Sequence, residues 1–468
     1  MTRFLYTIIS FLSLSMTCFW NKPLMAQSKE SPNIIFILTD DQRWDAMGIA
    51  GNKIIRTKNM DRLAKKGVYF KNAFATTPIC AASRASLLTG MYERTHKFTF
   101  QQGDLKDPYI EIAYPNFLKK AGYYTGFFGK LGVFFKNPEK LFEKAEIYDR
   151  NDKLPDERGY YKALNGDSIH LTKYTSIRAQ EFIRNAPKEK PFFLAVNFSA
   201  PHAHDPSGEQ YFWDEKYDAY YLKDRIPEPL LSTDSYFLAL PKEVRAGFNR
   251  IRWTWRFDTP ERYQKYVKGY FRMISQIDDE IGQIQKTLKK QGLDKNTIII
   301  FASDNGYFLA DRQIADKWLM YEPSIRIPLI IYDPRHGSKI VEEPVLNIDI
   351  PSTILDLAHA TIPSEYQGQS LLGYYLSGHK AKEREAIMFE HLWKKEEIPS
   401  SEGIRTKQWK YFRYRFIQAK DELYDLVNDP LETKNLSNDP NYKTIKQGLI
   451  KELEKQISFY EQKTLVKN

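Results

Sequence analysis

Short, continuous apolar runs alternate along this chain with segments of helical periodicity. Strands that are buried on both faces of a sheet read as unbroken apolar stretches, so the runs predict buried strands. The runs cover residues 33–38, 192–198, 297–302 and 328–332. Helical periodicity is present at residues 59–66, 83–88, 168–185, 261–291 and 350–358. Alternation of this kind predicts an α/β domain built on a mixed, mainly parallel sheet.

The character of the sequence changes at about residue 368. Polar and aromatic residues alternate at 409–415, and a helical pattern covers 442–462. Alternation with a period of two indicates a half-buried strand more readily than an aromatic nucleic-acid surface, because aromatic residues are good strand formers. We therefore expect a large domain at residues 27–367 and a small α+β domain with an antiparallel sheet at 368–468. Residues 205–259, rich in Tyr, Trp and Pro, are expected to form a long irregular insertion.

The first 26 residues have the features of a secretory signal peptide. Arg3 precedes an apolar stretch at residues 4–19, and Ala26 ends a segment suited to cleavage. The stretch is too short to predict a membrane span. Cys18 could instead carry a lipid anchor, but residues 15–17 match a lipidation signal poorly. We expect an exported protein, periplasmic or secreted, with anchoring through Cys18 as the less favoured alternative.

The chain is basic, with 69 Lys and Arg against 59 Asp and Glu and a formal charge of +10. Basic surfaces favour polyanions, and a sulfated glycan, a nucleic acid or an anionic membrane would each satisfy this inference. The sequence has no long Lys/Arg run, no zinc-finger spacing and no amphipathic membrane helix. We therefore predict neither a nucleic-acid partner nor a membrane span.

Polar side chains follow two of the predicted strands at their carboxyl ends, where open α/β sheets place their sites. Asp40 and Asp41 follow the first predicted strand, and Asp304 and Asn305 follow the third. Facing carboxylates would repel each other unless a cation lay between them. Three carboxylates with one amide oxygen suit Ca²⁺ best. Each cluster alone could equally be a helix cap or a turn.

Cys80 would be the one cysteine left after removal of the leader, so no internal disulfide is expected. It follows Pro78 where a helix is expected to begin, and free N–H groups at such a terminus attract anions. Arg84 lies four residues on, on the same helical face. The alternative is an inert buried thiol, because free cysteine is among the most buried residue types. Other groups that could join this site, each alone equally an ordinary surface residue, are Lys130, His202 and Lys317.

Taken together, these segments resemble the type I formylglycine-dependent sulfatases of the alkaline phosphatase superfamily over nearly the whole chain after the leader. Cys80, with Ala82, Arg84 and the run Ser86-Leu87-Leu88-Thr89-Gly90, is similar to the family's maturation motif. Further matching segments, in family order, are Thr39-Asp40-Asp41-Gln42, Gly129-Lys130, Ala200-Pro201-His202, Ser303-Asp304-Asn305-Gly306, Lys317 and Glu422-Leu423-Tyr424-Asp425-Leu426. The resemblance implies an alkaline-phosphatase-like α/β/α sandwich with a small carboxyl-terminal α+β domain.

The resemblance also implies the reaction: hydrolysis of sulfate monoesters on a carbohydrate, with ulvan and glycosaminoglycans fitting equally well. It implies that a maturation enzyme oxidises Cys80 to formylglycine, whose hydrate attacks sulfur and later expels sulfate. His202 would protonate the leaving alcohol, alone or with Lys317. The resemblance implies Ca²⁺ ligands at Asp40, Asp41, Asp304, Asn305 and the matured Cys80. Groups that would offset charge on the sulfuryl oxygens are Arg84, Lys130 and Lys317.

This chain departs from the family pattern at two positions. Lys130 is followed by Leu131-Gly132 where many members carry Trp-His-Leu-Gly, so a histidine that helps to release sulfate is missing. Either a subgroup with a shorter motif performs this step differently, or His204 or His391 supplies it. His391 could also contact a sugar. Ala82 replaces a proline found in many members, which suggests maturation by a radical enzyme that tolerates alanine.

Two other functions stay open at this point. A phosphodiesterase or phosphonate hydrolase of the same superfamily shares the metal ligands, although the complete set of basic groups at Arg84, Lys130, His202 and Lys317 favours sulfate. An inactive protein that binds sulfated glycans is suggested only by the missing histidine. Retention of Cys80 together with every metal ligand argues against it.

Overall fold

The computed structural model describes residues 31–100, 103–150, 160–205 and 208–466. Pro32–Asn468 forms one compact unit. The predicted signal peptide and Cys18 lie outside the described residues, and the domain boundary predicted at residue 367 stays a prediction. Within the described ranges, no helix combines the length and the apolarity that crossing a bilayer requires.

An eight-stranded mixed sheet forms the centre of this unit. In spatial order its strands are β14 (Lys339–Val341), β2 (Val68–Phe70), β13 (Leu329–Tyr332), β9 (Thr297–Ser303), β1 (Asn33–Thr39), β8 (Phe192–Asn197), β4 (Tyr124–Gly129) and β5 (Lys144–Ile147). The neighbours from β9 to β5 run parallel, whereas β13 is antiparallel to β9 and β2. All of β1 is buried, which explains its unbroken apolar run and confirms the predicted parallel core.

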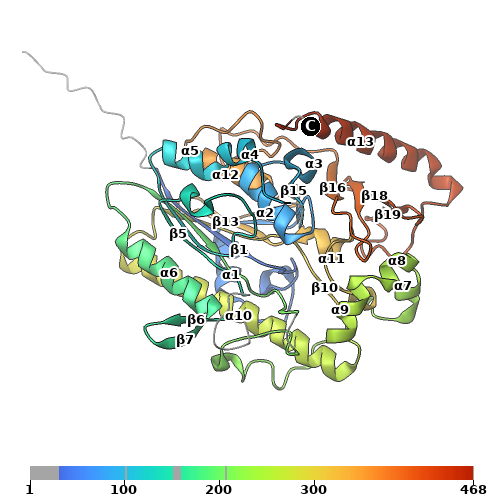
Figure 1. Ribbon diagram of the computed structural model, residues 1–468, viewed down its shortest axis with the longest axis horizontal. Coiled ribbons are helices and arrows are strands. Elements are labelled where there is room, and N and C mark those ends of the chain that lie inside the picture. Colours follow the sequence, from blue (N-terminus) through green and yellow to red (C-terminus); the bar gives the residue numbers. More distant parts are fainter. Residues whose placement is uncertain (1–30, 101–102, 151–159, 206–207, 467–468) are drawn as a thin grey trace, which may run out of the picture. The chain divides into compact units, whose positions relative to one another are not determined.

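Helices cover both faces of this sheet and give three layers (Figure 1). Alternate residues of β1 face opposite cores, with Ile35 and Ile37 in one and Ile34 and Phe36 in the other. The first core is covered by α1 (Lys58–Lys66), α6 (Leu171–Asn185) and α10 (Pro260–Lys290). The second is covered by α2 (Cys80–Thr89), α5 (Tyr114–Lys120) and α12 (Asp349–Leu357). The predicted α/β/α sandwich is therefore confirmed.

A four-stranded antiparallel sheet and a terminal helix follow, as predicted from the alternation at 409–415. The strands, in spatial order, are β16 (Ile387–His391), β17 (Ser401–Arg405), β18 (Trp409–Tyr414) and β19 (Glu422–Asp425), and the helix is α13 (Lys443–Glu461). Phe389 of β16 packs against Phe74 of β3 (Ala73–Phe74), a strand of a separate three-stranded sheet, with ring centroids 6.4 Å apart. The antiparallel sheet thus shares a hydrophobic core with that three-stranded sheet.

Three predicted segments differ from the structure. Residues 168–170 belong to the hairpin strand β7 (Asp167–His170), so α6 begins only at Leu171. The helix predicted at 83–88 begins three residues earlier, at Cys80. The insertion predicted to be irregular contains the short helices α7 (Asp234–Leu238), α8 (Lys242–Ala246) and α9 (Phe248–Arg256). Helices this short depend on tertiary packing, which a periodicity argument does not detect.

β4 is absent from the predicted strands because two of its six residues are glycines, which weaken a strand pattern. Gly129 ends the strand with φ of 114°, and a Cβ there would lie 1.9 Å from the carbonyl oxygen of Asn197. A Cβ on Gly126 would lie 2.5 Å from the ring of Phe182. Both glycines therefore permit close packing, and Gly129 does so directly before Lys130.

Candidate active site

The strand order brings distant segments of the chain to one edge of the sheet. Thr39 of β1 is in register with Ser303 of β9, so the chain leaves both strands at the same level toward the two acidic pairs. Gly129 of β4 is likewise opposite Asn197 of β8, which brings Lys130 to this edge. These are the carboxyl ends of parallel strands, where the sequence predicts the site.

The four predicted oxygen ligands meet in a fully buried cluster. The backbone N–H of Asp41 donates to Oδ1 of Asp304 at 3.2 Å, and Nδ2 of Asn305 donates to Oδ1 of Asp41 at 2.7 Å. Asp41 adopts φ of 65°, in the left-handed region that disfavours most side chains. This backbone turn directs two consecutive carboxylates, those of Asp40 and Asp41, into the cluster.

The cluster fits a hard divalent cation. Three of its buried oxygens accept no hydrogen bond from any described residue: Oδ1 of Asp40, Oδ2 of Asp41 and Oδ1 of Asn305. Buried polar atoms are rarely left without a partner. Burial, together with the carboxylates of Asp40 and Asp304, raises the pKa of Asp41 to about 7. Ligand atoms of Asp40, Asp41 and His202 also lie within 4.8 Å of one another. Carboxylate and amide oxygens in this arrangement suit Ca²⁺.

Cys80 is the first residue of α2, and its side chain is buried with 8% of the residue exposed. Burial raises the pKa of its thiol, although the positive charges of Lys317 and Lys130 act in the opposite direction. The thiol is therefore held neutral although two cations act on it, at a helix terminus with free N–H groups. A neutral thiol is a poor nucleophile. The surroundings suit an anion better than they suit cysteine chemistry.

Arg84 lies one helical turn after Cys80 and links the two acidic pairs. Its Nε donates to Oδ2 of Asp304 at 2.7 Å, and its Nη2 lies 3.3 Å from Oδ2 of Asp40. Its Nη1 donates to the carbonyl oxygen of Lys130 at 2.7 Å. Gly132 makes room for this side chain, because a Cβ there would lie 2.7 Å from Cδ of Arg84. Arg84 thus orients the carboxylates directly.

Two buried lysines pair with the carboxylates that follow β1. Nζ of Lys130 forms an ion pair with Oδ2 of Asp40 and lies 3.5 Å from Oδ2 of Asp149, and Nζ of Lys317 pairs with Oδ1 of Asp41. Burial alone would lower the pKa of Lys317, but the carboxylate of Asp41 raises that pKa above its usual value. Both lysines are therefore cations next to the Cys80 thiol.

His202 completes the set of predicted groups. Its Nδ1 lies 2.5 Å from the carbonyl oxygen of Ala203, so we place the proton of the neutral ring on Nδ1. Its Nε2 lies 3.4 Å from Oδ2 of Asp41 and 3.4 Å from Nη2 of Arg150. Burial lowers the pKa of His202 well below its usual value, and Arg150, Lys317 and Lys130 lower it further. The ring is therefore neutral in this state, with a lone pair on Nε2.

Asp149 and Arg150 belong to this cluster but are missing from the sequence prediction. Asp149 lies next to Lys130, and Arg150 lies next to His202. Both follow β5, a short strand of mixed polarity that gives no apolar run. The parallel pairing of β5 with β4 is the only signal that could have located them, and it is a property of the fold.

The two histidines proposed as replacements differ in position: burial lowers the pKa of His204, and the charges of Arg150 and Asp149 also act on it, whereas no such effect of a cluster residue is found for His391 among the described residues. His204 packs edge-on against the rings of Tyr160 and Phe212, with centroids 6.4 Å and 6.0 Å away. His391 is fully buried in β16, near Trp393. A role for either in substrate binding stays a prediction.

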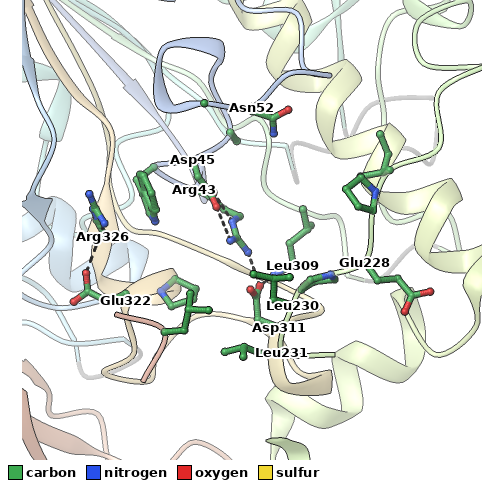
Figure 2. Close-up of a pocket in the computed structure, with 18 of the residues that line it drawn as sticks. Arg43, Asp45, Asn52, Glu228, Leu230, Leu231, Leu309, Asp311, Glu322 and Arg326 are labelled. Carbon is green, nitrogen blue, oxygen red and sulfur yellow. Dashed lines mark hydrogen bonds and ion pairs between the residues drawn. The ribbon is translucent and has the colours of Figure 1, made fainter. Parts of the chain in front are cut away.

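A pocket of about 670 Å³ opens elsewhere on the protein (Figure 2). Its lining includes none of the predicted site residues. Arg43 joins two of its sides by donating to Oδ2 of Asp311 at 2.5 Å and pairing with Asp45. This pocket is therefore distinct from the buried ionic cluster, and its lining combines apolar side chains with charged ones such as Asp311 and Glu322.

Two family models match the chain. The model described as sulfatase covers residues 32–360, and the model described as N-sulphoglucosamine sulphohydrolase, C-terminal, covers residues 311–458. The first spans all the strands of the large sheet and every predicted ligand and catalytic residue. The second spans the antiparallel sheet and most of α13.

Among curated proteins, the arylsulfatase of Clostridium perfringens (strain 13 / Type A) is 29% identical and aligns with 90% of this chain and 94% of its own length. The N-acetylglucosamine-6-O-sulfatase of Bacteroides thetaiotaomicron is 27% identical, with 92% and 86% covered. A solved complex with the substrate D-glucosamine-2-N,6-O-disulfate has a TM-score of 0.77 at 25% identity, covering 92% of this chain and 99% of that chain. A phosphonate monoester hydrolase from Silicibacter pomeroyi has a TM-score of 0.76 at 21% identity, covering 91% and 95%.

Proposed function

This chain belongs to the sulfatase family and is a sulfuric ester hydrolase, and we propose that it removes sulfate from a carbohydrate. The observation that carries the proposal is the position of Cys80 at the start of α2, where the charges of Lys317, Lys130 and the buried carboxylates Asp40 and Asp304 all act on it. The carbohydrate class is supported by relatives that are named as sugar sulfatases or were solved with a sulfated glucosamine.

In this proposal, Cys80 is converted to formylglycine by a maturation enzyme. When matured, the hydrated aldehyde supplies an oxygen nucleophile for sulfur and a second hydroxyl through which the carbonyl re-forms as sulfate leaves. Lys130 and Lys317 are cationic and lie near this position, so they stabilise the negative charge on the sulfuryl oxygens. Arg84 contributes by holding Asp40 and Asp304 in place.

The residues that would hold Ca²⁺ are Asp40, Asp41, Asp304 and Asn305, together with the matured Cys80. Their unpartnered oxygens support this choice. When bound there, the ion would supply positive charge that stabilises the sulfuryl oxygens. The cluster is fixed from several sides by Arg84 and the two lysines, so its carboxylates need little rearrangement on binding.

His202 is proposed to donate a proton to the oxygen of the leaving alcohol. The three cations that lower its pKa act on a site without substrate. An anionic sulfate ester would offset that field and favour the protonated ring, so substrate binding itself prepares the acid. Proton transfer then goes from Nε2 to the alcohol oxygen as the bond from sulfur to that oxygen breaks.

The alternatives have less support. The likeness to a phosphonate monoester hydrolase is at 21% identity and supports the fold alone. An inactive binding protein would have no need of Cys80 flanked by two lysines and a complete set of oxygen ligands. We also propose export through the signal peptide at residues 1–26, in accord with a polymeric substrate outside the cell.

Peptide mass spectrometry across Cys80, paired with desulfation assays on a panel of sulfated sugars, tests this function. We expect a loss of about 18 Da at Cys80, the thiol-to-aldehyde change, and release of sulfate from at least one sugar. Cys80→Ala should abolish turnover while its circular dichroism spectrum and thermal unfolding stay unchanged. Matured Cys80 with no sulfate release from any ester, or full activity in Cys80→Ala, would overturn the proposal.

A further inference from the structure

Arg150 lies beside Lys130 because of the order of the strands. β5 pairs in parallel with β4, with Ile147 opposite Gly129, and the N–H of Tyr148 donates to the carbonyl oxygen of Gly129 at 3.0 Å. The chain therefore leaves both strands at the same edge, with Lys130 after one and Asp149 and Arg150 after the other. None of the motifs that resemble the family contains Arg150.

The guanidinium of Arg150 is mostly enclosed, with 11% of the side chain exposed. Its Nη1 lies 3.2 Å and 3.3 Å from the two carboxylate oxygens of Asp149, and its Nη2 lies 3.4 Å from Nε2 of His202. Its Nε is buried and has no hydrogen-bond partner in the part of the chain that the structure describes. A buried charged donor without a partner is costly, so this group is suited to a further acceptor.

Charge balance indicates the kind of acceptor. Asp149 lies near both Arg150 and Lys130, and Lys130 also pairs with Asp40, so carboxylates match these cations before any metal binds. Arg150 also lies against His202, whose proposed role requires it to carry a proton. A divalent cation in the oxygen cluster would add further positive charge to this edge of the sheet. An anion with several oxygens would satisfy the free donor and offset the excess charge.

We propose that Arg150 binds a sulfuryl oxygen of the substrate, which gives this site an anion-binding side chain beside Lys130 where Leu131-Gly132 has none. The inference rests on the proposed function, because the anion is the sulfate of that reaction. Arginine suits the role, since its planar fork of N–H donors matches tetrahedral oxyanions. Held between Lys130 and His202, it contacts the sulfate on the side from which the alcohol leaves.

Calorimetric titration of inorganic sulfate into the calcium-loaded protein tests the inference without requiring turnover. Arg150→Ala should weaken sulfate binding roughly ten- to a hundredfold, the worth of a hydrogen bond to a charged group. Arg150→Lys should recover part of this loss, and the exposed Arg225→Ala should match the unchanged protein. Thermal unfolding of each variant checks the fold, and Arg150→Gln substitutes if the alanine variant does not fold.

Kinetics on an active sulfate ester separate this inference from the proposed function. We expect Arg150→Ala to raise KM and lower kcat/KM, with Arg150→Lys intermediate. If the unchanged protein releases sulfate and Arg150→Ala binds and turns over substrate equally well, Arg150 is no sulfate ligand and the function stands. If matured protein releases no sulfate but Arg150→Ala still loses sulfate affinity, the anion site stands and the function fails. No sulfate binding by the unchanged protein would overturn the inference.

Discussion

Nε of Arg84 lies 2.7 Å from Oδ2 of Asp304, so α2 is connected directly to the residue that follows β9. The same guanidinium reaches Oδ2 of Asp40 after β1. One side chain therefore sets the separation of the two acidic pairs and keeps them next to Cys80. The first two predictions concern this contact.

Arg84→Ala should destabilise the protein strongly, because it leaves the buried carboxylate of Asp304 without its paired cation, whereas Asp40 keeps Lys130. Loss of one partner of a buried ion pair costs about 3–5 kcal/mol. Urea unfolding in the presence of calcium measures the change. Arg178→Ala is the matched control, since Arg178 pairs with Glu146 and Glu181 at a partly exposed position and should cost less than about 1 kcal/mol. Equal losses of unfolding free energy in Arg84→Ala and Arg178→Ala would contradict a stabilising role for the buried ion pairs of Arg84.

Gly132→Ala should reduce activity by at least about tenfold through Arg84. Its φ is 71°, and the added Cβ would lie 2.7 Å from Cδ of Arg84. Gly122→Ala is the control for backbone strain, because its φ is 85° and nothing lies within 4 Å of an added Cβ. Both variants should lose about 1–2 kcal/mol of stability. Only Gly132→Ala should lose kcat/KM, and an equal loss in Gly122→Ala would show that strain alone is responsible.

Removal of calcium should lower the melting temperature, and its return should restore it. At a free calcium concentration one hundred times the dissociation constant, binding adds about 2.7 kcal/mol to the free energy of unfolding. Asn305→Ala removes an oxygen that accepts no hydrogen bond and also the Nδ2 donor to Asp41, so it should reduce the calcium-dependent shift as well as the stability in chelator. Differential scanning calorimetry with and without chelator checks both expectations. A melting temperature that chelation leaves unchanged would rule out a structural ion here.

Glu93→Gln should stabilise the protein at pH 8 but not at pH 5. Burial and the nearby Glu390 raise the pKa of Glu93 to about 8. The folded protein therefore holds this proton more tightly than the unfolded chain, where the pKa is near 4.5. Stability from the protonated group is complete below pH 4.5 and is lost as the pH rises toward 8. Glutamine mimics the protonated form at every pH.

Urea unfolding at pH 5, 6.5 and 8 measures the difference between Glu93→Gln and the unchanged protein. The free energy of unfolding of the variant should exceed that of the unchanged protein by an amount that grows with pH across this range. The exposed Glu385→Gln is the control and should show no such trend. If the free energies of unfolding of Glu93→Gln and the unchanged protein differ by the same amount at all three pH values, the carboxyl of Glu93 lies in a more polar environment than its contacts indicate.

The sequence predicted those strands whose side chains are buried on both faces of the sheet, because such strands are almost entirely apolar. β1, β8 and β9 lie between two helical layers, so almost every side chain in them must be apolar. β4 and β5 could not be predicted in this way. β4 contains glycines that are required by contacts with Asn197 and Phe182, and β5 lies at the edge of the sheet with exposed, polar residues.

The same distinction applies to the site. Asp40, Asp41, Asp304 and Asn305 directly follow apolar strands, so position in the chain predicted their meeting. Arg150 follows a strand without a recognisable pattern, and its nearness to Lys130 depends on which strands are neighbours. His204 lies two residues after His202, and the ring contacts that it makes are with Tyr160 and Phe212.

The burial of Cys80 has a consequence for how an active molecule is made. Cys80 is the first residue of α2, and only 8% of the residue is exposed. An enzyme that oxidises its Cβ must reach this side chain, which the folded protein encloses. The proposed maturation must then precede closure of the core. The active fraction of any preparation would then depend on the relative rates of modification and folding during biosynthesis. A molecule that folds before it is modified would stay inactive.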